Sequence, residues 1–152
     1  MANHHKLIEI LNQAVSLEYT AIVQYNQHSM LLTGPDKEVF EELFTKQAEE
    51  ALTHAKTWGE KIVYLGGVPT VELGEIHQST DLTEMLEMDL ELETRAVEAY
   101  SLARDVCDHV PTAYLLEDQI IAEQDDVERL AKILGQVRLA RGAASAPSAQ
   151  AV

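Results

Sequence analysis

The chain has 152 residues, with 26 acidic and 11 basic side chains and a formal charge of −15, which argues against nucleic acids and anionic membranes as partners. One cysteine, Cys107, excludes an internal disulfide, and no apolar run resembles a signal peptide or is long enough to span a bilayer. Alanine, leucine and glutamate are abundant, so we expect one helical domain in the cytoplasm.

The first half of the chain predicts two helices joined by a tight turn. Apolar positions recur at steps of three and four over residues 3–32, which is typical of an amphipathic helix. Gly34-Pro35 interrupts this pattern and suits the start of another helix, predicted over residues 35–65. Gly66-Gly67 ends it. Because the turn between them is short, the two helices form an antiparallel hairpin.

The second half predicts another hairpin, reached through a long link. Asp81 and Glu84 have the spacing of a capping box, so a third helix begins near Asp81, and Pro111 restarts the chain as a fourth. The link over residues 67–80 spans roughly 46 Å when extended, about the length of the second helix. It can therefore cross the whole molecule. An all-α bundle of four helices, with one long crossover between helices two and three, is the ferritin-like architecture.

The composition changes near the end of the chain. Residues 142–152 are small and unpatterned, and we assign them to a flexible tail. Residues 1–141 then form the four-helix bundle.

Each predicted helix carries an acid or a histidine near its middle, where its apolar stripe calls for an apolar residue. These residues are Glu18, His54, Glu93 and Glu123. Mid-helix positions lie at one height in a bundle, so the four groups should converge in the core. Burying ionised carboxylates without compensation costs several kcal/mol, and the bases nearby, Lys46, Lys56 and Arg95, face outward by phase. Divalent metal is the remaining compensation, and carboxylates with imidazole suit two iron or manganese ions.

Three segments resemble bacterioferritins. They are L-N-Q-A-V-S-L-E-Y-T-A-I-V-Q-Y-N-Q-H at 11–28, K-I-V-Y-L-G-G-V-P at 61–69 and D-L-E-L-E at 89–93. The resemblance covers about residues 6–134. It implies a ferritin-like bundle with a di-iron centre that oxidises Fe(II) with dioxygen or peroxide.

The resemblance also implies a ligand set. Bacterioferritins use a glutamate on the first and third helices and Glu-x-x-His on the second and fourth. The residues on these positions are Glu18, His54, Glu93 and Glu123. Tyr25 matches a tyrosine beside the centre, which implies a catalytic role for it.

Three positions depart from that pattern. Ala51 stands where the second-helix glutamate is expected, and Asp126 replaces the fourth-helix histidine. We favour Glu50 as the substitute ligand, because Glu50 and His54 are four residues apart and residues at this spacing lie on one helix face. The alternative is a true vacancy at Ala51, with a weak, mononuclear or empty site. Leu52 occupies the position of the haem-binding methionine, so we expect no haem.

We therefore expect an iron-binding protein with an Fe(II)-oxidising di-iron site, for iron storage or detoxification, in a homo-oligomer. Two alternatives remain: a non-storage di-iron or manganese oxidase or peroxidase, and a metal-poor partner subunit. Fold alone does not decide among them.

Overall fold

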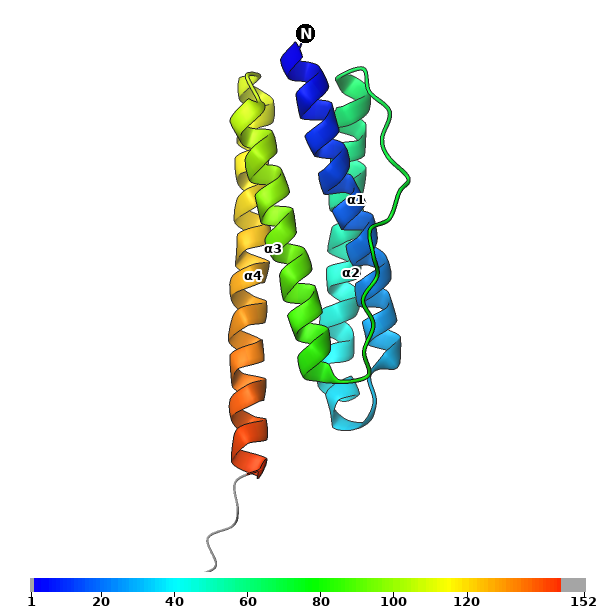
Figure 1. The fold of residues 1–152 in the computed structure, drawn as a ribbon, viewed down its shortest axis with the longest axis vertical. Coiled ribbons are helices and arrows are strands. Elements are labelled where there is room, and N and C mark those ends of the chain that lie inside the picture. Colours follow the sequence, from blue (N-terminus) through cyan, green and yellow to red (C-terminus); the bar gives the residue numbers. More distant parts are fainter. Residues whose placement is uncertain (1, 146–152) are drawn as a thin grey trace, which may run out of the picture.

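The computed structural model describes residues 2–145, and it is a bundle of four helices. They are α1 (Ala2–Leu31), α2 (Gly34–Tyr64), α3 (Leu82–Val106) and α4 (Val110–Ser145). Helices α1 and α2 form one antiparallel hairpin, α3 and α4 form another, and an extended strap over residues 65–81 returns the chain to the opposite end (Figure 1). The predicted architecture is confirmed. None of the helices within residues 2–145 is both long and apolar enough to cross a membrane.

The helix boundaries follow from local chemistry. Asp81 caps α3 by accepting a hydrogen bond from the Glu84 amide at 3.0 Å. The capping box is not completed directly, because the Glu84 carboxylate accepts from the Ser79 hydroxyl instead. At the other end of the chain, α4 continues through residues 142–145, which the sequence had placed in the tail. The remainder of the predicted tail, residues 146–152, lies outside the described residues.

The core consists of two apolar clusters with a polar layer between them. The first cluster surrounds Leu11, Trp58, Tyr100 and Leu116. The second surrounds Tyr25, Phe44, Met85 and Leu130. Along every helix, the acid or histidine identified from the sequence lies between the residues of these two clusters. The bundle therefore holds polar groups at mid-height while both ends are packed like an ordinary protein interior.

A row of polar side chains on α1 holds the strap in place. Its members, four residues apart, are Asn12, Ser16, Thr20 and Gln24. Each one hydrogen-bonds strap backbone, as when Thr20 Oγ1 accepts from the Gly74 amide at 2.8 Å. Four helical residues advance about 6 Å and two extended residues about 6.6 Å. The strap therefore keeps its register with α1 along most of the helix.

A buried histidine–aspartate pair ends this row. His28 is fully buried, with Nδ1 2.9 Å from Asp89 Oδ2 and Nε2 3.1 Å from the carbonyl oxygen of His77. Because a carbonyl only accepts, Nε2 carries a proton. Gln24 donates to Asp89 Oδ1 at 2.8 Å and accepts from the His77 amide at 3.1 Å. This closed ring of hydrogen bonds joins α1, α3 and the strap.

Candidate metal centre

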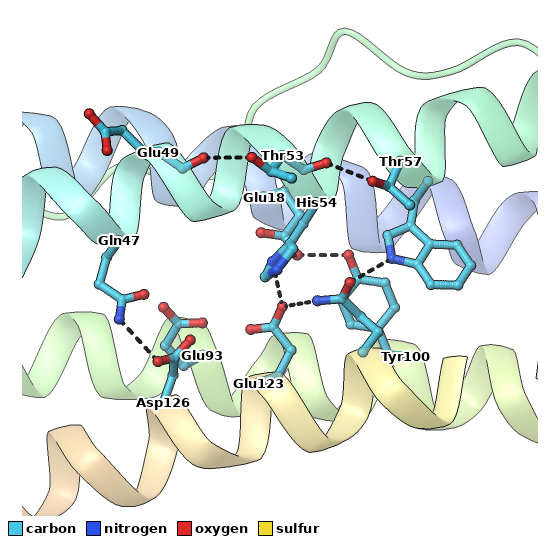
Figure 2. Close-up of polar contacts among 12 residues, drawn as sticks. Glu18, Gln47, Glu49, Thr53, His54, Thr57, Glu93, Tyr100, Glu123 and Asp126 are labelled. Atoms are coloured by element: carbon cyan, nitrogen blue, oxygen red, sulfur yellow. Dashed lines mark hydrogen bonds and ion pairs between the residues drawn. The ribbon is translucent and has the colours of Figure 1, made fainter. Parts of the chain in front are cut away.

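Five ionisable side chains from all four helices meet in the polar layer (Figure 2). Glu18 comes from α1, His54 from α2, Glu93 from α3, and Glu123 and Asp126 from α4. The exposed fractions of the three glutamates are 3%, 6% and 1%, in chain order. The predicted convergence in the core is thus observed. Their role as metal ligands stays a prediction.

The first group of potential ligands contains the imidazole. One donor atom from each of Glu18, His54 and Glu123 lies within 4.8 Å of the others. His54 Nδ1 is 3.0 Å from Glu123 Oε1 and 3.4 Å from Glu18 Oε1. The three side chains therefore enclose a position with two carboxylate oxygens and one nitrogen.

The second group contains oxygen donors alone. Glu93, Glu123 and Asp126 also bring one oxygen each within 4.8 Å, so Glu123 belongs to both groups. Asp126 Oδ1 accepts from Gln47 Nε2 at 3.0 Å and from Arg129 Nη2 at 3.0 Å. Arg129 was not among the bases considered from the sequence. Asp126, the most exposed carboxylate of the site, therefore has a cationic partner, Arg129, on its own helix.

The second helix does not place Glu50 in either group. Glu50 is half-buried, and its charge contributes to raising the pKa of Asp126, for which burial is the larger cause. Ala51 is buried in the apolar cluster beside the site, where its methyl group offers no ligand atom. Leu52 is 55% exposed and likewise has no donor for a haem iron.

A layer of hydrogen bonds orients the carboxylates. Tyr25, fully buried, donates to Glu93 Oε1 at 2.5 Å, next to the second group as the resemblance implied. Tyr100 donates to Glu18 Oε1 at 2.7 Å. These contacts leave the glutamate oxygens with fixed orientations, which metal ligands require.

A second chain of hydrogen bonds reaches the shared carboxylate. Trp58 Nε1 donates to Gln119 Oε1 at 3.0 Å, and Gln119 Nε2 donates to Glu123 Oε1 at 2.6 Å. The sequence did not identify these supports. Gln119 and Glu123 are four residues apart on one helix face, and this spacing could have predicted the contact between them.

Burial and hydrogen bonds shift the pKa values of the site. Burial raises the pKa of Glu18 to about 8, against the opposing hydrogen bond from His54. Burial lowers the pKa of His54, but hydrogen bonds to Glu123 and Glu18 outweigh it and raise that pKa to about 10. Burial, with the nearby Glu123 charge, holds the pKa of Glu93 well above its usual range.

Glu123 is the carboxylate that stays ionised. Burial pushes its pKa up, but hydrogen bonds from His54 and Glu93 outweigh burial and lower that pKa. Near neutral pH, Glu123 is therefore ionised, His54 is an imidazolium and Glu18 is mainly protonated. The raised pKa values of Glu93 and Asp126 favour their protonated forms. Each of these protons occupies a place that a cation can take.

The donor set fits paired transition-metal ions. Oxygen and imidazole donors suit iron and manganese. The two groups share one carboxylate, which matches the way such bundles bridge two ions with glutamates from facing helices. Burying several acidic side chains costs free energy even when they are protonated, so their presence in the core is not explained by stability.

Comparison with known proteins agrees with this geometry. A model of the ferritin-like domain matches residues 8–140. A bacterial ferritin of Neisseria meningitidis serogroup B is 27% identical over 128 residues, covering 84% of this chain and 82% of that protein. A bacterioferritin of Desulfovibrio desulfuricans is 35% identical over 127 residues, covering 78% of this chain and 69% of that protein.

A solved structure shows the same fold. It is described as one of the ferritin-like, diiron-carboxylate proteins from Bacillus anthracis str. Ames, and it superposes with a TM-score of 0.85 at 29% identity. The superposition covers 88% of this chain and 99% of that one. With the family match over residues 8–140, these likenesses show that the chain belongs to the ferritin family as a bacterioferritin-like member.

Proposed function

We propose that this protein binds iron and oxidises Fe(II) at a paired carboxylate site inside the bundle, for iron storage or detoxification. The observation that carries the proposal is the pair of three-donor groups that share Glu123. The names of the relatives, bacterial ferritin and bacterioferritin, and the diiron-carboxylate description of the structural neighbour support iron as the metal.

The side chains of the two groups define two metal positions. Glu18 and His54 would hold one Fe(II), Glu93 and Asp126 would hold the other, and Glu123 would be within reach of both, since its carboxylate belongs to both groups of donors. Each Fe(II) gives up one electron, so a pair reduces dioxygen to peroxide, or peroxide to water, with two protons taken up. Buried carboxylates favour the more highly charged Fe(III) product. Tyr25, hydrogen-bonded to Glu93, is the catalytic candidate beside this site.

Fe(II) reaches the site from the side of α2 and α4. His54 and Asp126 are the most exposed members of the two groups, at 20% and 13% of their side chains, whereas the three glutamates are nearly inaccessible. The strongly acidic chain attracts cations toward this side of the site.

Further parts of the proposal concern partners and setting. We propose a homo-oligomer without haem, located in the cytoplasm, with dioxygen or peroxide as the oxidant. Manganese is the other metal that the donors suit. The vacancy at Ala51 favours one alternative, a metal-poor partner subunit. In that case, protein from iron-supplemented cells would contain less than about 0.2 metal ions per chain.

Anaerobic titration with Fe(II), followed by exposure to air, tests the function. The parent should bind about two Fe(II) per chain and oxidise them. Glu18→Ala and His54→Ala should lose both properties, while Glu91→Gln, an exposed acid on α3, should behave like the parent. Parent-like stoichiometry in both site variants would reject the site. Gel filtration separates a storage shell of several hundred kilodaltons from a small oxidase.

A further inference from the structure

Gln47 reaches the second group from α2. Its exposed fraction is 2%, and its amide points at Asp126 across the gap between α2 and α4 (Figure 2). It lies four residues before Ala51, on the same helix face, so it approaches the site one turn away from the vacant position. Glu50, by contrast, is outside both groups of donors.

The amide of Gln47 has two ends that can exchange places. In the structure, Nε2 donates to Asp126 Oδ1 at 3.0 Å. Half a turn about the last side-chain bond brings Oε1 to the place of Nε2, because the two ends are nearly identical in shape. An amide oxygen is a good donor to hard cations.

We propose that Gln47, rather than Glu50, is the ligand that α2 supplies to the second metal position. This inference rests on the proposed function, since it completes the same site. The second position then consists of oxygen donors from Glu93, Glu123, Asp126 and Gln47. The rotated amide gives up its hydrogen bond to Asp126 and contacts the cation instead.

The assignment makes the two positions unequal. The first position offers the imidazole of His54 beside two carboxylates, while the second offers only oxygen donors. Its neutral amide adds no negative charge, and Arg129 lies 3.0 Å from its outer carboxylate. Metal should therefore fill the first position before the second.

Calorimetric titration of the full chain with Mn(II) tests the assignment, with electron paramagnetic resonance to distinguish coupled pairs from isolated ions. The parent should bind two Mn(II) in separate steps. Gln47→Leu should keep the first step and weaken the second at least about tenfold, as loss of even an outer partner of a metal ligand does. Its spectrum should show isolated ions. Glu50→Gln, the matched control on the same helix turn, should retain both steps.

A second variant guards against misfolding. Gln47→Glu keeps the shape of the side chain and adds a charge, so its second step should tighten by about tenfold. Parent-like second steps in Gln47→Leu and Gln47→Glu, or loss of the second step in Glu50→Gln, would overturn the assignment. Failure of the parent to bind either Mn(II) or Fe(II) would instead reject the proposed function itself.

Discussion

Metal binding at about pH 7 should release protons from the site. His54, with a pKa of about 10, and Glu18, with a pKa of about 8, are mainly protonated at that pH. The pKa of Glu93 is raised as well. His54 and Glu18 must lose their protons before their donor atoms can bind a cation, and any proton on Glu93 must leave as well. Loading both positions should therefore release at least about two protons per chain, against none for a site whose carboxylates are ionised and whose imidazole is neutral.

Isothermal titration with Mn(II) measures this number. The titration is repeated in buffers of different ionisation enthalpy, and the slope of observed heat against buffer enthalpy equals the protons released. Glu18→Gln, which has no proton to lose, should release about one proton fewer. The exposed Glu91→Gln should match the parent. Release of fewer than about one proton by the parent would refute the account of a proton-balanced site.

The same protons determine how the stability of the metal-free protein depends on pH. The folded pKa values of Glu18 and His54 lie above their unfolded values of 4.5 and 6.5. The folded state therefore binds more protons than the unfolded state, and the free energy of unfolding falls as the pH rises. The loss spans pH 4.5 to about 8 for Glu18, and pH 6.5 to about 10 for His54. Thermal melts of metal-free protein should show the midpoint falling from pH 6 to pH 9. A flat or rising midpoint would contradict these pKa directions.

Three further substitutions test separate contacts. Arg129→Gln removes a cation beside the second position, so Mn(II) titration should show its second step tightened about fivefold, unlike the remote surface variant Arg104→Gln. Asp89→Ala leaves His28 without its buried partner and should lower the free energy of unfolding by about 3 kcal/mol in a urea melt; a loss under about 1 kcal/mol would contradict the closed ring. Tyr25→Phe should keep the metal content but slow Fe(II) oxidation at least about tenfold, and an unchanged stopped-flow rate would remove Tyr25 from the reaction.

Much of the architecture can be predicted from the linear pattern because it depends on local rules. Helical periodicity and the Gly34-Pro35 and Gly66-Gly67 breaks place the first two helices within a residue or two of their observed ends. The strap is long enough to cross the whole bundle, which predicts that the third helix begins at the opposite end. The mid-helix positions of the acids predict their convergence, because helices packed side by side bring equal heights together.

The orientation of single side chains could not be predicted in this way. Adjacent helical residues differ by about 100° in direction, so whether Glu50 or Gln47 faces the site depends on how α2 is rotated in the bundle. That rotation is set by packing against other helices. The position of Asp126 beside Gln47 depends equally on the separation of α2 and α4.

The sequence by itself therefore determined four helices, one crossover and a ring of acids at mid-height, since propensity, periodicity and chain length act locally. Tertiary structure decided what compensates those acids. It brought Glu123 against His54, and it buried both members of the His28–Asp89 pair completely. Charge balance in a protein interior depends on distances between distant parts of the chain, and only the packed helices fix those distances.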